Sequence, residues 1–459
     1  MSKLSNTIAL FVVALSATAQ TNPAITGWLR NTTGITGSHY ASGNPTPIAD
    51  SDSANVKTVL YSTNWAYIRT NGVPSYITGP FLDGNPSLTT SQNAIFKMPL
   101  NPVQNTGTPT PTTMGNIGLF VNGVALFDYR DGVAWNTTTN SLCGGPGNPP
   151  CPGGPNATQN WNRDAVVAER AGFDCAKGHP AMGNYHHHQN PSAFDLDLTV
   201  ISTICNLYDA DGLYASDSTQ HSPLIGFAYD GFPIYGAYGY LNTNGTGGIV
   251  RIKSGYQLRN ITTRTHWADG TDVPDGPAVS ATYPLGYFRE DYEFISHPQD
   301  PEYLDEHNGR FCVTPEYPAG IYCYFATVDA NWNSAFPYVV GPTFYGVKTA
   351  VKVTTISEPV TVYNPAPTGI ATASVDENSI NVFPVPASDF VAMQVKGLVS
   401  DVIRITLFDV SGKQVSSYKV SNTFSTIEIG SSELSAGTYF YQLKVNGESI
   451  GSKKMLVIK

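Results

Sequence analysis

The chain has 459 residues, which is too long for one ordinary hydrophobic core and predicts two or three domains. Its 43 glycines, 33 prolines and 26 tyrosines accompany a low charged fraction of 13%, so turn formers and strand formers dominate over helix formers. The net charge of −10 argues against a nucleic-acid partner, because few basic groups are available to neutralise phosphates. We therefore expect a mainly β protein that does not bind nucleic acid.

The first residues have the order of a secretory signal peptide. Lys3 precedes an apolar run from Ile8 to Leu15, and small residues follow up to Ala19, which predicts a signal peptide over residues 1–19. The apolar run is too short to cross a bilayer, and no later stretch approaches the roughly 20 apolar residues that a span needs. The sequence therefore predicts an exported protein without a transmembrane segment.

Export favours disulfides over thiolate metal sites for the six cysteines. Sequence alone leaves several connectivities open, and the short loops between neighbouring cysteines favour one of them. The pairs expected on this basis are Cys143–Cys151, Cys312–Cys323 and Cys175–Cys205.

Taken in chain order, alternating apolar residues predict strands separated by turns. The expected strands of the first domain are Val56–Tyr61, Trp65–Thr70, Ala94–Met98, Ile117–Phe127, Leu196–Leu207 and Ile225–Tyr240. Asn-Gly pairs at positions 71–72 and 122–123 are hairpin signals. One short helix is expected over Asp164–Gly172, with Gly172 as its C-terminal stop.

The proline-containing stretch 356–375 is typical of a linker. Seven short alternating segments follow within residues 376–459 and predict a small β-sandwich. The fold class expected from the sequence is thus mainly β, with a large irregular β-rich domain over residues 20–355 followed by a small C-terminal β-sandwich.

The C-terminal segment resembles the sorting domain of the Bacteroidetes type IX secretion system. The motifs that carry the resemblance are Asn381–Ser388, Leu407–Lys413, Leu434–Tyr439 and Lys453–Lys459. Val385 departs from the asparagine that this family usually has between its two prolines. The resemblance implies that the type IX secretion machinery is a partner, and that the protein is secreted or attached to the outer-membrane surface.

The densest group of metal-binding or proton-transferring side chains lies in Gly183–Pro191, where three histidines are consecutive. Side chains alternate along a strand, so His186 and His188 are expected on one face and Tyr185 and His187 on the other. Two imidazoles at this spacing can chelate a divalent ion such as zinc or copper. Two ligands seldom hold a metal alone, so further ligands are expected from elsewhere in the chain.

His179 is the nearest additional candidate, and Asp305 or His307 can complete the site; Asp230 is a further carboxylate to consider. Two alternatives remain open. Imidazoles beside tyrosines can form a hydrogen-bonded network without a metal. Metal-free acid–base chemistry is also open to a histidine near Asp305 or Glu306.

A second resemblance covers roughly residues 52–345 and is to the bacterial YHYH domain family. The segments that carry it are Gly178–Pro180, Gly183–His188, Ile225–Gly236, Leu304–Phe311, Thr314–Gly320, Tyr322–Thr327 and Phe336–Val339, with Asn116–Phe127 before them. His187 departs from the pattern by standing where the family has its second tyrosine. Cys323 stands where some relatives repeat a histidine-containing signature.

The resemblance implies little about function, because metal binding in this family is itself an inference from the histidines. We therefore expect a secreted or cell-surface protein with a metal site made by His179, His186 and His188 together with Asp305 or His307. A metal-dependent extracellular enzyme is one alternative, and no catalytic residue is assigned for it. A surface glycan-binding or adhesive module with structural histidines is the other.

Overall fold

The computed structural model describes residues 20–364, apart from 45, 82–87, 146, 154–158 and 193–211, and most of 380–458 in short stretches. The expected signal peptide 1–19 and the expected strand Leu196–Leu207 lie outside the described residues. The chain divides into two compact units, Met1–Tyr363 and Asn364–Lys459. Strands, most of them antiparallel, dominate both units and confirm the mainly β fold class.

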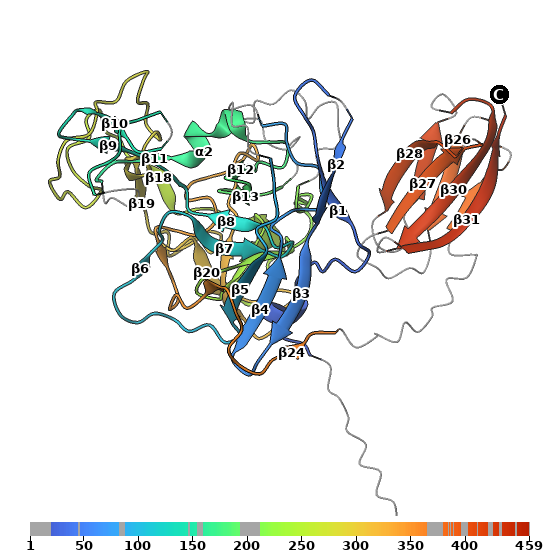
Figure 1. Cartoon of the computed structure of the whole chain (residues 1–459), viewed down its shortest axis with the longest axis horizontal. Coiled ribbons are helices and arrows are strands. Elements are labelled where there is room, and N and C mark those ends of the chain that lie inside the picture. The colour runs from blue at the N-terminus through green and yellow to red at the C-terminus, as the bar shows by residue number, and fades with distance from the viewer. Residues whose placement is uncertain are drawn as a thin grey trace, which may run out of the picture. The chain divides into compact units, whose positions relative to one another are not determined.

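An eight-stranded sheet forms the centre of the first unit (Figure 1). Its strands, in spatial order, are β12 (His179–Ala181), β13 (Asn184–His187), β8 (Ala125–Phe127), β7 (Asn116–Phe120), β14 (Leu224–Ala228), β15 (Pro233–Tyr235), β21 (Ile321–Phe325) and β20 (Gly309–Cys312). The sheet is mixed, because β13 runs parallel to β8 and β15 runs parallel to β21. The histidine-bearing strands β12 and β13 therefore lie at one end of the sheet, and β20 lies at the other.

A five-stranded antiparallel sheet packs with it. The strands in order are β23 (Val351–Val353), β5 (Ala94–Pro99), β4 (Trp65–Thr70), β3 (Val56–Tyr61) and β24 (Thr361–Val362). One apolar cluster contains Ile68 and Phe96 from this sheet and Leu119 and Phe227 from the central sheet. The predicted strands 56–61 and 65–70 are confirmed with the same bounds.

Smaller sheets surround this core. They are β10 (Ser141–Cys143), β9 (Arg130–Asn136) and β11 (Asn162–Asp164); β1 (Thr36–His39) with β2 (Ile48–Ser53); β16 (Tyr238–Tyr240) with β17 (Ile249–Arg251); β18 (Tyr256–Leu258) with β19 (Tyr292–Phe294); and β22 (Thr343–Phe344) with β6 (Thr110–Pro111). The α-helices of the described residues are α1 (Pro23–Thr26) and α2 (Ala165–Ala168). No helix among these residues is long and apolar enough to cross a membrane.

The predicted helix 164–172 is present but interrupted. α2 ends at Ala168, Glu169 is its C-cap, and a 3-10 turn continues over Arg170–Gly172. The Asp164 carboxylate caps the N-terminus of α2 by accepting a 2.8 Å bond from the backbone N–H of Val166. The interruption leaves Glu169 at the junction of two helical turns.

The structure confirms one predicted disulfide and corrects another. Cys143 and Cys151 are bonded. Cys312 and Cys323 are buried free thiols, so the predicted bond between them is wrong. In the antiparallel pair β20–β21, Cys312 faces Ile321 and Cys323 faces Arg310, so the two cysteines are diagonal neighbours. This diagonal placement leaves the two thiols close enough to interact with each other, but no disulfide joins them.

Only one cysteine of the third predicted pair lies among the described residues. Cys175 takes part in a disulfide. Its expected partner, Cys205, lies outside the described residues.

The second unit contains two antiparallel sheets. One has the order β25 (Ile380–Phe383), β26 (Phe390–Val395), β29 (Thr426–Gly430). The other has the order β28 (Gln414–Val420), β27 (Ile403–Asp409), β30 (Gly437–Val445), β31 (Glu448–Val457). A single cluster of buried apolar residues, including Met393 and Leu407, draws on both sheets and forms the core of this unit.

Candidate metal centre

The β12–β13 hairpin brings two of the histidines together. Met182 and Gly183 connect the strands with φ angles of 49° and 82°, and two successive positive φ angles are what a type I′ hairpin turn requires. In the resulting register His179 lies directly opposite His186. Opposite residues point to the same face of the sheet, and the two ring centroids are 4.6 Å apart.

His188 joins this pair from just beyond the end of β13. Its Nε2 atom lies 3.0 Å from Nε2 of His186, which confirms that these two side chains share a face. One nitrogen from each of His179, His186 and His188 lies within 4.8 Å of the others. The structure thus brings together three of the five predicted ligands.

Glu169 is the fourth group at this point, and the sequence reasoning missed it. Its carboxylate Oε2 atom lies 3.2 Å from Nε2 of His179 and 3.2 Å from Nε2 of His188. Figure 1 shows α2 close to β12 and β13, and this packing places the helix end over the hairpin. The glutamate side chain is 26% exposed, whereas the three histidines are buried.

Backbone carbonyls fix the orientation of two of the rings. Nδ1 of His186 lies 2.9 Å from the carbonyl oxygen of Asn184, and Nδ1 of His188 lies 2.6 Å from that of Asp128. A carbonyl oxygen can only accept a hydrogen bond, so the proton of each neutral ring is on Nδ1. In the neutral form of each ring, Nε2 then carries its lone pair toward the centre of the cluster.

Aromatic rings enclose the cluster and keep water away from it. Phe127 stacks on His186 with centroids 3.8 Å apart, and Phe173 meets His179 edge-on at 5.0 Å. Burial lowers the pKa of His186 well below its ordinary value, and the neighbouring imidazoles lower it further. Burial raises the pKa of Glu169, but hydrogen bonding and positive charge from the protonated forms of His179 and His188 outweigh burial and lower the pKa. The site therefore combines a neutral His186 imidazole with an ionised carboxylate.

The opposite face of β13 is used differently. Tyr185 donates its hydroxyl proton to Asp174, at 2.9 Å from Oδ2. His187 donates from Nδ1 to the carbonyl oxygen of Lys177 at 3.1 Å and accepts at Nε2 from the Tyr76 hydroxyl at 2.7 Å. Burial sets the pKa of His187 at about 3. Both ring nitrogens of His187 are thus occupied within the protein.

Asp305 and His307 are not at this site. They precede β20 at the far end of the central sheet, six strand spacings from β13, or roughly 25–30 Å. The Asp305 carboxylate accepts from Tyr322 at 2.9 Å, and Nδ1 of His307 lies 2.8 Å from the Thr343 hydroxyl. The structure corrects the expectation that either residue completes the histidine cluster. Asp230 is likewise engaged elsewhere, because it accepts from the backbone N–H of Gly346 at 2.8 Å.

The fold and the site together define a mainly β protein in which a hairpin at the end of a mixed sheet carries a buried histidine cluster. Residues 95–337 match the family described as YHYH protein, and the chain belongs to this family. Residues 381–459 match the secretion system C-terminal sorting domain. No curated protein matches the chain.

The sorting domain bears on where the protein acts. It implies recognition by the type IX secretion machinery and export, with the protein secreted or at the cell surface. The histidine cluster therefore belongs to a protein that works outside the cytoplasm.

Proposed function

We propose that the exported first unit binds one divalent metal ion, zinc or copper, through His179, His186, His188 and Glu169. The carrying observation is that one ring nitrogen from each of His179, His186 and His188 lies within 4.8 Å of the others, beside the Glu169 carboxylate. When both rings are neutral, the Nε2 lone pairs of His186 and His188 face each other at 3.0 Å and repel each other. A cation between them removes the repulsion and turns both nitrogens into ligands.

The spacing of the four groups supports this proposal. In a tetrahedral zinc site with bonds of about 2.0 to 2.1 Å, neighbouring ligand atoms are about 3.3 Å apart. The His186–His188, His179–Glu169 and His188–Glu169 separations are 3.0, 3.2 and 3.2 Å. Three imidazoles and one carboxylate also form a donor set that suits zinc or copper.

The hydrogen bonds behind the ligands support it as well. Metal-binding histidines usually donate their second ring N–H to a carbonyl or carboxylate, which fixes the ring and makes it a better ligand. His186 and His188 do so through the carbonyl groups of Asn184 and Asp128. These bonds hold both rings in the orientation that a metal site needs.

The arrangement favours a structural site over a catalytic one. Catalytic zinc sites usually keep one position open for water or substrate, whereas four protein groups fill a tetrahedral site. The ion would tie β12, the edge strand of the central sheet, to the end of α2. Such a connection would stabilise an edge hairpin outside the cell.

The test is calorimetric titration of chelator-treated protein with zinc and, separately, copper at neutral pH. We expect one ion per chain, and we expect Glu169→Gln to weaken binding by at least about tenfold, because it removes the only anionic ligand. The matched control is Glu306→Gln, which alters a glutamate 3.9 Å from a histidine at the other end of the sheet. Wild-type protein that binds neither metal, or equal affinities for both variants, would contradict the proposal.

A further inference from the structure

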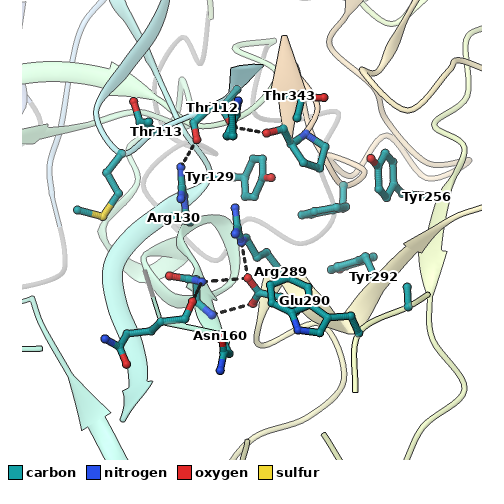
Figure 2. Close-up of a pocket in the computed structure, with 18 residues that line it drawn as sticks. Thr112, Thr113, Tyr129, Arg130, Asn160, Tyr256, Arg289, Glu290, Tyr292 and Thr343 are labelled. Carbon is teal, nitrogen blue, oxygen red and sulfur yellow. Dashed lines mark hydrogen bonds and ion pairs between the residues drawn. The ribbon is translucent and has the colours of Figure 1, made fainter. Parts of the chain in front are cut away.

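The first unit also contains a large cavity that none of the four proposed metal ligands lines. Its volume is about 1120 Å³, slightly above the range of about 300 to 1000 Å³ that is typical of ligand pockets. The walls come from β6, β9, β11, β18, β19 and β22 and from the loop that contains Phe336 (Figure 2). Its size, and the absence of the four proposed ligands from its lining, indicate a separate binding site.

One side of the cavity is an aromatic wall built around Phe336. Tyr292 stacks on Phe336 with centroids 4.1 Å apart and an angle of 5° between the rings. Tyr256 and Tyr129 meet the same ring edge-on, at 5.4 and 5.1 Å. Trp267 adds a further indole to the lining. These rings offer flat apolar surface together with hydroxyl groups.

The charged groups of the cavity are paired within the protein. Arg130 bonds to the carboxylate of Asp128, and Arg289 bonds to that of Glu290. Glu290 also accepts from the backbone and side-chain nitrogens of Asn162, at 2.7 and 2.9 Å. Figure 2 shows the bonds of Glu290 beside the open space. The two arginines are therefore neutralised, and the cavity offers no net charge to a ligand.

Two polar groups of the lining have no partner among the described residues. The hydroxyl of Tyr129 is buried without a hydrogen bond, although the residue is only 1% exposed. A buried hydroxyl without a partner is costly, but this one has almost no accessible surface and does not face a ligand directly. The partly buried side chain of Asn160 also lines the cavity, and no described residue bonds it. The Asn160 amide is therefore available to a polar ligand.

We propose that this cavity binds a neutral oligosaccharide. A sugar ring has an apolar C–H face that stacks on aromatic rings and a rim of hydroxyl groups that pair with hydroxyls and amides. The lining matches both surfaces, and its paired charges disfavour anionic ligands such as phosphates. The many polar groups disfavour a purely apolar ligand. This inference is independent of the metal proposal, because none of the four proposed ligands lines the cavity.

The test is calorimetry of the full chain with the neutral hexasaccharides cellohexaose, laminarihexaose, maltohexaose and chitohexaose, and with hexagalacturonate as the charged comparison. We expect saturable binding of at least one neutral hexasaccharide. Tyr292→Ala should weaken it roughly tenfold through the lost stacking surface. Asn160→Ala should weaken it several-fold with little change in melting temperature, because no described residue bonds this side chain.

The matched control is Tyr303→Ala, which removes a half-buried tyrosine outside the cavity. It should leave the affinity unchanged. The proposal is overturned if no neutral hexasaccharide binds, if only hexagalacturonate binds, or if Tyr292→Ala and Asn160→Ala both bind as the wild type does. Repeating the titration on chelator-treated protein should give the same affinity.

Discussion

The two faces of β13 put the same residue type to different uses. On one face, His186 and His188 bond to backbone carbonyls through Nδ1 and turn both Nε2 atoms toward each other and toward Glu169. On the other face, His187 bonds through both nitrogens, to Lys177 and Tyr76. All three rings are buried. Burial therefore does not distinguish a ligand from a structural histidine, whereas the partner of the second nitrogen does.

This difference explains why the departure of His187 from the family signature is tolerated. The position faces Tyr185 and Tyr76 and not the cluster, with ring centroids 5.2 and 6.4 Å away. A tyrosine and a histidine can both serve there as hydrogen-bonding aromatic residues. The cluster on the opposite face is unchanged by the substitution.

The largest effect is expected when the side chains of His186 and His188, which face the cluster, are removed. The double substitution His186→Ala and His188→Ala should lower zinc or copper affinity by more than about 100-fold, because it deletes two of four ligands. His187→Ala should keep the metal stoichiometry of the wild type even though it loses stability. Equilibrium dialysis followed by elemental analysis measures both. Equal metal loss in the two proteins would contradict the different roles that we assign to the two faces of β13.

A smaller effect is expected in the pH dependence of stability, through Asp174, which accepts from Tyr185 on the face of β13 opposite the histidine cluster. Burial raises the pKa of Asp174 from 3.8 to about 6. A carboxyl group with a raised folded-state pKa contributes stability below 3.8 that is lost as the pH rises through 6. Between pH 4.5 and 7 this loss is about 2 kcal/mol, at about 1.4 kcal/mol for each pH unit.

Asp174→Asn should remove this dependence. When the pH falls from 7 to 4.5, the change in the free energy of unfolding should be less favourable for the variant than for the wild type. This holds whatever the stability of the variant at pH 7. Denaturant unfolding at both pH values measures the difference, and contributions from other titrating groups cancel because both proteins share them. Parallel pH profiles would show that Asp174 does not hold a proton in the folded state.

The smallest effect is expected from Tyr76→Phe. This change removes the hydroxyl that donates to Nε2 of His187 but leaves the ring in place. The expected loss is about 1 kcal/mol in the free energy of unfolding, the usual net value of one hydrogen bond. Metal affinity should not change. A weakened metal site in this variant would mean that the two faces are coupled through the strand.

Part of the site could be predicted from the sequence because it is local. Strand alternation alone places His186 and His188 on one face, and a short turn returns the chain to His179. Glu169 could not be placed in this way, because its position depends on how α2 packs over the hairpin. The available signal was its position in the one helix predicted close before the histidines.

The predictions for Asp305, His307 and the Cys312–Cys323 bond failed because they, too, depended on contacts between distant parts of the chain. Asp305 and His307 were attractive ligands by residue type, but the sequence does not reveal that β20 and β13 occupy opposite ends of one sheet. The pairing of Cys312 with Cys323 was predicted from the short loop between them, and the register of β20 and β21 makes them diagonal neighbours. Strand positions follow from local patterns, whereas strand order and register depend on distant contacts.

X-ray absorption spectroscopy of the zinc-loaded protein tests the central claim most directly. The account predicts a first shell of four nitrogen and oxygen atoms near 2.0 Å, with scattering from three imidazole rings. This spectrum should be unchanged in His187→Ala and should lose one imidazole in His188→Ala. A shell dominated by water or sulfur, or a spectrum altered by His187→Ala, would contradict it.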